Sequence, residues 1–248
     1  GLPSPISMPV PASFQDLFTE AWQRDYCGDF WYEHDFYVPE FTENQRVILR
    51  FGSITHRAVV YVNGKEVGYS EDSKNTAEFK LNKYLKEGKN SLVLKIFRWS
   101  TGSYLECQDF WRISGIERDV FLFSQPKNHI RDFQVVSTLD NTYKNGIFKL
   151  ATAVQTESQQ NDLSLTYELL DAQGNVVAQG TQKSDKFNQI FEAQLPDVKT
   201  WTSEHPNLYQ LLITLKEGDK VTEVIPHKVG FRRFEIKEIE EKGENGKP

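Results

Sequence analysis

The sequence predicts an all-β protein made of two β-sandwiches in series. Apolar and polar residues alternate with a period of two along many short segments, which is the pattern of half-buried strands. Turn-forming residues separate these segments at short intervals, and the spacing favours antiparallel sandwiches. The pair Asn63-Gly64 lies between two such segments and is the clearest hairpin signal, because both residues tolerate a positive φ. A chain of 248 residues suits one large or two ordinary domains.

The first module occupies residues 1–126. Four prolines before residue 12 exclude a helix there, and residues 1–25 are expected to be extended, with a short turn at 14–18 capped by Ser13. We expect strands at 30–38, 46–51, 58–62, 66–69, 77–81, 91–97 and 119–123, and one helical turn at 81–86. Longer loops and more aromatic residues than in the second half favour a jelly-roll sandwich.

The second module begins after Pro126 and occupies residues 127–236. We expect strands at 130–139, 146–155, 163–171, 175–179, 189–195, 208–215 and 221–229. About seven short strands with regular turn signals are typical of an immunoglobulin-like sandwich. Residues 237–248 are charged and rich in glycine, and we expect an unpacked tail or a linker there.

Composition excludes several classes of function. A net charge of −6 without any basic stretch argues against nucleic-acid and anionic-membrane partners. No apolar run reaches the roughly 20 residues of a membrane helix, and we expect no signal peptide within these residues. We favour the cytoplasm, although the leading glycine leaves open a trimmed targeting segment. Two cysteines, Cys27 and Cys107, are too few for a disulfide framework, and we expect reduced thiols.

The segment 98–123 is the main candidate for function. It holds two tryptophans and the one dense group of charged residues, and it connects two predicted strands through an apparently irregular loop. The charged residues are Glu106, Asp109, Arg112, Glu117, Arg118 and Asp119. They form either a salt-bridge network that holds the loop or a site in which one carboxylate faces a ligand or cation. A tryptophan in a strand pattern is more often core than a sugar platform, and Trp111 is the main candidate exception.

Other catalytic signatures are missing from the sequence. It contains no GxGxxG, P-loop, HExxH or GxSxG motif. The five histidines show no ligand spacing, and we interpret them as surface or packing residues. They are His34, His56, His129, His205 and His227.

The same segment resembles family 2 glycoside hydrolases, and closely their β-galactosidases. The resemblance rests on Arg98-Trp99-Ser100, Gly102-Ser103-Tyr104-Leu105-Glu106, Gln108-Asp109-Phe110-Trp111-Arg112-Ile113-Ser114-Gly115-Ile116 and Arg118-Asp119-Val120. It is supported by Val62-Asn63-Gly64 with Val67-Gly68, by Trp201-Thr202-Ser203-Glu204 with Pro206, and by Val229-Gly230-Phe231-Arg232. The resemblance covers about residues 8–234. The first 35 residues are more similar to the β-glucuronidase branch, through Met8 to Phe14 and Gly28 to Tyr32.

This resemblance implies a jelly-roll sugar-binding domain, an immunoglobulin-like sandwich and then a catalytic TIM barrel. The barrel and both catalytic carboxylates are expected outside these 248 residues. Asp109 matches the aspartate that reaches the active site of family β-galactosidases and contacts the galactose and a monovalent cation. Cys27 stands where those enzymes have an asparagine that touches the sugar, and Cys107 stands where they often have an acid.

We therefore expect a non-catalytic N-terminal fragment of a β-galactosidase that braces the barrel and contributes a loop to the sugar pocket. Asp109, Trp111 and Cys27 are the expected substrate-binding residues, and Asp109 the expected cation ligand. The expected partners are a β-galactoside or a related sugar and the catalytic barrel of the parent chain. The parent enzyme is expected to be a homo-oligomer, with Na⁺ or Mg²⁺ as its candidate ion. The alternatives are a β-glucuronidase fragment, a free-standing carbohydrate-binding module and a structural, adhesin-like pair of sandwiches with Asp109 and Trp111 buried.

Overall fold

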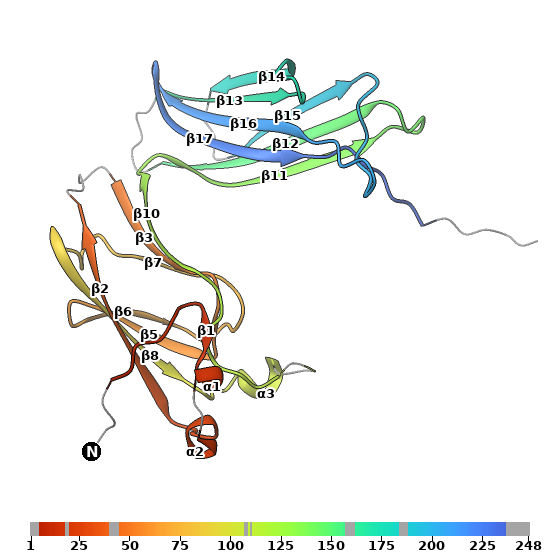
Figure 1. Cartoon of the computed structure of the whole chain (residues 1–248). Coiled ribbons are helices and arrows are strands. Elements are labelled where there is room, and N and C mark those ends of the chain that lie inside the picture. Colours follow the sequence, from red (N-terminus) through yellow and green to blue (C-terminus); the bar gives the residue numbers. More distant parts are fainter. Residues whose placement is uncertain are drawn as a thin grey trace, which may run out of the picture. The chain divides into compact units, whose positions relative to one another are not determined.

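The regular secondary structure of the described residues is mainly β-strand, and the chain divides into two compact units, Gly1–Pro126 and Lys127–Pro248 (Figure 1). The computed structural model describes residues 5–17, 20–39, 45–106, 109, 111–156, 162–183 and 188–236. In this described part of the chain, no helix combines the length and apolar character of a membrane span. The predicted all-β fold class is confirmed.

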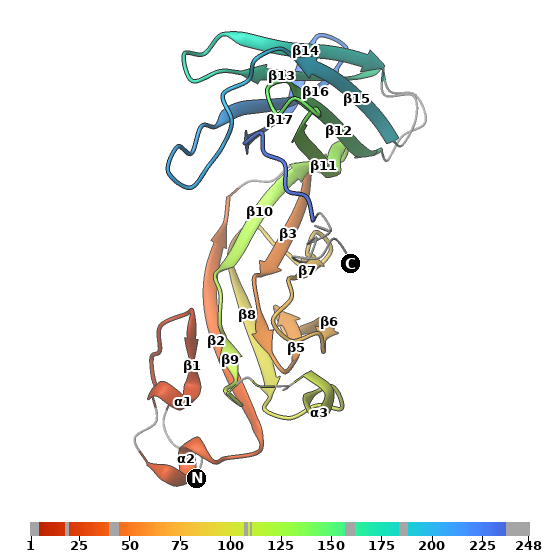
Figure 2. The same cartoon turned by 90° about the vertical axis from the view of Figure 1, so that its right-hand side faces the viewer.

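The first unit is the jelly-roll sandwich. Its strands are β1 (Ala12–Ser13), β2 (Asp29–Val38), β3 (Gln45–Phe51), β4 (Ile54–Thr55), β5 (Arg57–Val62), β6 (Lys65–Ser70), β7 (Ala77–Lys80), β8 (Gly88–Phe97), β9 (Gly115–Ile116) and β10 (Val120–Pro126). They form the sheets β2-β8-β5-β6, β10-β3-β7 and β1-β9-β4. Three short helices, α1 (Phe14–Leu17), α2 (Ala21–Arg24) and α3 (Ser103–Glu106), lie at the same end of this unit (Figures 1 and 2).

The core of this unit follows from the period-two pattern. Ala58, Val60 and Val62 of β5 are fully buried and pair in register with Ile96, Leu94 and Leu92 of β8. The buried side chains of β5 and β8 face buried residues of β3, so that the sheets β2-β8-β5-β6 and β10-β3-β7 enclose one apolar core. Between β5 and β6, Asn63 and Gly64 have φ values of 50° and 76°, as the hairpin signal predicts.

Two predictions for this unit were wrong in detail. Residues 98–119 are not wholly irregular, because they contain α3 and β9, and residues 1–25 contain α2 and β1 in addition to the expected turn. Helix α2 begins with a capping box between Glu20 and Gln23, whereas β1 and β9 exist through pairing with each other. Strands of two residues leave no alternation to recognise, and their pairing joins segments about 100 residues apart.

The second unit is the immunoglobulin-like sandwich. Its strands are β11 (His129–Leu139), β12 (Gly146–Gln155), β13 (Leu163–Leu170), β14 (Val176–Lys183), β15 (Asn188–Leu195), β16 (Tyr209–Glu217) and β17 (Lys220–Val229). They form the antiparallel sheets β11-β12-β15 and β14-β13-β16-β17. Alternate residues of both sheets, including Phe148, Leu165 and Ile213, are fully buried in one core.

Candidate functional site

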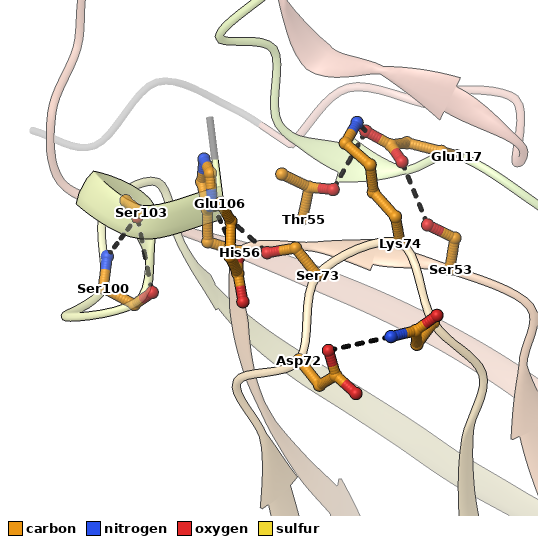
Figure 3. Close-up of polar contacts among 11 residues, drawn as sticks. Ser53, Thr55, His56, Asp72, Ser73, Lys74, Ser100, Ser103, Glu106 and Glu117 are labelled. Carbon is orange, nitrogen blue, oxygen red and sulfur yellow. Dashed lines mark hydrogen bonds and ion pairs between the residues drawn. The ribbon is translucent and has the colours of Figure 1, made fainter. Parts of the chain in front are cut away.

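The candidate site is the loop between β8 and β10, which we call the Asp109 loop and define as residues 98–119. A buried polar cluster holds its C-terminal part (Figure 3). Glu117 accepts hydrogen bonds from Ser53 Oγ and Thr55 Oγ1, both at 2.9 Å, and from Lys74 Nζ at 3.4 Å. Because Ser53 and Thr55 are buried, this carboxylate satisfies hydroxyl groups that water reaches poorly. Glu117 therefore anchors the loop to the segment around β4.

His56 lies beneath the N-terminal part of the loop. Its side chain is only 5% exposed, and Nδ1 lies 3.2 Å from Ser73 Oγ and 3.9 Å from Glu106 Oε2 (Figure 3). Trp99 stacks on the imidazole with a centroid distance of 6.0 Å and an interplanar angle of 17°. Burial lowers the pKa of His56 below its usual value near 6.5, although the Glu106 carboxylate opposes this shift.

Trp99 in turn connects the two flanks of the loop. The guanidinium groups of Arg98 and Arg112 lie 5.5 and 5.8 Å from the centre of its ring, which is the range of cation–π contacts. Arg98 Nη1 also donates to the carbonyl of Tyr26 at 2.9 Å, and the Arg98 amide donates to Gly28 O at 3.3 Å. The chain on both sides of Cys27 is therefore attached to the start of the Asp109 loop.

The N-terminal segment closes the far end of the loop. Ser13 pairs with Gly115 through β1 and β9, and the Phe14 amide donates to Ser114 O at 3.2 Å. Gln15 Oε1 accepts from the Ser114 amide at 3.0 Å. This role of residues 12–15 was not predicted from the sequence, in which Ser114-Gly115 was the one local signal.

All three predicted substrate-binding residues are exposed. Asp109 lies in a turn after α3, Trp111 is 86% exposed, and Cys27 is exposed in the first unit. Tyr104 and Leu105 of α3 are 85% and 81% exposed, so the loop presents large apolar side chains next to an accessible carboxylate. The adhesin-like alternative expected buried Asp109 and Trp111 and is wrong on this point. Cys107, Gln108 and Phe110 lie outside the described residues.

The four acidic residues of the loop fall into two groups, two that contact the protein interior and two that face the solvent. Glu117 accepts hydrogen bonds from buried hydroxyl groups, and Glu106 is turned toward His56. Asp109 and Asp119 are exposed. Within the described residues, no group of three or more His, Cys, Asp or Glu side chains could hold a metal ion. The loop can therefore offer Asp109 as one oxygen ligand or hydrogen-bond acceptor, with the rest of a binding site coming from elsewhere.

A second aromatic surface covers the outer face of the sheet β2-β8-β5-β6. Trp31 is 57% exposed and stacks with Tyr61 at 6.4 Å and 23°, and Lys95 Nζ lies 5.2 Å from the Trp31 ring. Tyr69 is 60% exposed, with the Arg57 guanidinium 5.4 Å from its ring. The expectation that a tryptophan in a strand is core was wrong for Trp31, because its position alternates with the inward-facing Phe30 and Tyr32. We call the following five residues the outer aromatic face: Trp31, Arg57, Tyr61, Tyr69 and Lys95.

The second unit contains a different hollow. It has a volume of about 410 Å³ and is open to the surface beside the turn that follows β13. None of the predicted site residues lines it, and Asp171, one of its two acidic residues, already accepts hydrogen bonds from Gln173 and Asn175 in its own turn. This hollow is therefore separate from the candidate site.

The fold and the loop define the chain as a pair of β-sandwiches with an exposed carboxylate and exposed aromatic rings on a braced loop, an architecture that proteins of many functions share. Comparison with known families identifies the family to which the chain belongs. Residues 5–126 match the family described as glycosyl hydrolases family 2, sugar binding domain, and residues 128–232 match glycosyl hydrolases family 2. The chain belongs to glycosyl hydrolase family 2, and the predicted resemblance is confirmed.

The relatives include β-galactosidases and β-glucuronidases. The chain is 39% identical over 214 residues to a β-galactosidase of Priestia megaterium, covering 81% of this chain and 21% of the relative. A β-galactosidase of Streptococcus thermophilus is 39% identical over 208 residues, which cover 82% of this chain and 20% of the relative. The β-glucuronidase of Ruminococcus gnavus in complex with D-glucuronic acid has a TM-score of 0.82 and 33% identity, with 96% of this chain and 42% of that chain covered. The chain thus spans about a fifth of the length of these curated relatives.

Proposed function

We propose that this chain forms the non-catalytic N-terminal part of an enzyme that hydrolyses terminal β-D-galactosides. The observation that carries the proposal is the similarity of 81% of the chain to β-galactosidases at 39% identity, across both sandwiches. The same relatives extend far beyond the matched part, so a catalytic domain in the same parent chain is the expected site of bond cleavage. A homo-oligomeric parent belongs to this proposal.

Asp109 is the proposed contact to the sugar. An exposed carboxylate accepts hydrogen bonds from sugar hydroxyl groups, and its hard oxygen atoms suit Na⁺ or Mg²⁺. One carboxylate fits such a cation but does not complete its coordination, so the remaining ligands would come from the catalytic domain, the sugar or water. Trp111 offers an exposed ring for stacking on the sugar, and Cys27 is a weaker candidate because a thiol is a poor hydrogen-bonding group.

The exposed side chains of the Asp109 loop fit an interface with that catalytic domain. Tyr104, Leu105 and Trp111 are each more than four-fifths exposed and lie within eight residues of one another in the sequence. Clustered large apolar side chains at the surface are characteristic of an interaction site. Burial against the catalytic domain would place Asp109 at the rim of its active site.

The direct test compares this chain with the protein encoded by its complete reading frame. We expect the purified 248-residue chain to leave nitrophenyl β-galactoside intact and the longer protein to hydrolyse it faster than nitrophenyl β-glucuronide. Asp109→Asn in the longer protein should lower kcat/KM by roughly 10²-fold, because it weakens binding of the reacting sugar. Asp219→Asn, an exposed change in the β16–β17 turn, is the matched control. Preference for the glucuronide would favour the β-glucuronidase alternative, and hydrolysis by the short chain would refute a non-catalytic role.

A second candidate function is free-standing carbohydrate binding through the outer aromatic face. Its support is the exposure of Trp31 and Tyr69 on one sheet, beside charged groups that can bond sugar hydroxyls. It predicts binding of soluble β-glycans by the chain alone in calorimetry. Trp31→Ala should abolish that heat and Asp109→Asn should leave it unchanged. No heat at millimolar glycan would remove this candidate.

A further inference from the structure

His56 is a buried titratable group to which the proposed function gives no role. Trp99 stacks on the face of its ring. Ser73 and Glu106 lie at its Nδ1 edge (Figure 3). Histidine between a serine and a carboxylate suggests a nucleophilic triad, but a triad needs the two partners on opposite ring nitrogens. Here both partners approach the same nitrogen, so the cluster is not built for nucleophilic catalysis.

The two partners compete for that nitrogen. In the neutral ring with the proton on Nε2, Nδ1 accepts a hydrogen bond from the Ser73 hydroxyl, and Glu106 Oε2 is left without a donor. That oxygen is buried and makes no hydrogen bond to the residues that the structure describes. In the protonated ring, Nδ1 becomes a donor, and Glu106 is the charged acceptor 3.9 Å away. Proton uptake therefore turns Nδ1 from an acceptor of the Ser73 hydroxyl into a donor, for which the Glu106 carboxylate is the charged acceptor and the Ser73 oxygen the neutral one.

Both loop contacts of His56 lie close to Asp109 in the sequence. Trp99 precedes α3, and Glu106 ends α3 three residues before Asp109. Ser100 and Ser103 close the intervening turn, since the Ser100 amide donates to Ser103 Oγ at 2.8 Å. Arg112, on the other side of Asp109, reaches the same cluster through the Trp99 ring. The contacts of His56 and of the Trp99 ring therefore involve residues on both sides of the turn that carries Asp109.

We propose that His56 is a positioning residue for the Asp109 loop and that proton uptake by its ring moves the Nδ1 contact from Ser73 to Glu106. One consequence of this inference rests on the proposed function. If Asp109 contacts the sugar, the orientation of that contact depends on pH. The charges that face the ring come from every neighbouring segment. Glu106 and Glu117 favour the proton, whereas Lys74 and the burial of the ring oppose it.

The test follows the proton by NMR in the 248-residue chain. The imidazole signals of His56 and the amide signals of residues 99–112 should titrate with one common midpoint. His56→Phe keeps a ring on Trp99 but removes Nδ1, and it should abolish the loop titration while the sandwich stays folded. His34→Phe, which changes an exposed histidine of β2, is the matched control and should leave the loop titration unchanged.

Glu106→Gln supplies a second measurement that does not depend on folding of the His56 variant. The Glu106 carboxylate raises the pKa of His56, so its neutralisation should move the common midpoint to lower pH. Ser73→Ala removes the competing partner and should move the midpoint to higher pH. Loop amides that do not follow His56, or a midpoint unmoved by Glu106→Gln, would overturn the proposal. Absence of galactoside hydrolysis by the complete protein would refute the proposed function and leave this result standing.

Discussion

At the scale of single residues, Glu117 determines how firmly the Asp109 loop is held. Its two oxygen atoms accept from two buried hydroxyl groups and one lysine, and these bonds come from β4, its preceding residue and the turn after β6. Glu117→Gln removes the charge and one acceptor while keeping the size of the side chain. We expect a loss of about 2 kcal/mol in the free energy of unfolding, because a buried hydroxyl then lacks its partner.

Urea unfolding of the purified chain measures this loss. Glu66→Gln changes an exposed carboxylate in the β5–β6 hairpin and should cost less than about 0.5 kcal/mol. Equal stability of the two variants would mean that Glu117 has no anchoring role.

Single residues also show where sequence reasoning works. The exposure of Asp109 and Trp111 could be predicted, because the motif that contains them is continuous and lies in a loop. The environment of His56 could not be recognised, because its partners come from residues 73, 99 and 106 and meet only in the folded chain. A histidine without ligand spacing carries no local sign of such an environment.

At the scale of elements, strands with several alternating residues were recognisable and strands of two residues were not. Strand β12 was predicted at residues 146–155, which are its observed bounds, because buried and exposed side chains alternate along all of it. Strands β1, β4 and β9 depend instead on pairing with one another. These short pairings are tertiary contacts, and they hold the C-terminal end of the Asp109 loop, which contains β9.

Gly115 in β9 tests that contribution. Its φ is +143°, and a Cβ atom at this position would lie 2.6 Å from the carbonyl oxygen of Ala12. Gly115→Ala should therefore separate β9 from β1 and lower the free energy of unfolding by roughly 3 kcal/mol. Gly64→Ala is the matched control, since Gly64 also has a positive φ but no atom lies within 4 Å of its Cβ position.

The control should lose only about 1 kcal/mol, which is the cost of the backbone conformation alone. Hydrogen exchange should show faster exchange at Phe14 and Ile116 in Gly115→Ala and no such change in Gly64→Ala. Similar losses in both variants would show that the approach of β1 to β9 is unimportant for stability.

At the scale of the whole molecule, each unit has a core made from its own residues. The core of the first unit contains Ile96 and the core of the second contains Leu165, both fully buried. Compact units with separate cores are expected to unfold as separate cooperative transitions. Order in the Asp109 loop is then expected to depend on the stability of the first unit alone.

Scanning calorimetry of two core variants tests this expectation. Ile96→Ala and Leu165→Ala each remove buried methyl groups and should cost about 3 kcal/mol in their own unit. Each should lower one transition by roughly 10 °C and leave the other in place. Ile96→Ala should also increase the exchange of the Asp109 loop amides, whereas Leu165→Ala should not. If both variants shifted one common transition, the two sandwiches would be a single cooperative unit, and loop mobility would then respond equally to damage in either core.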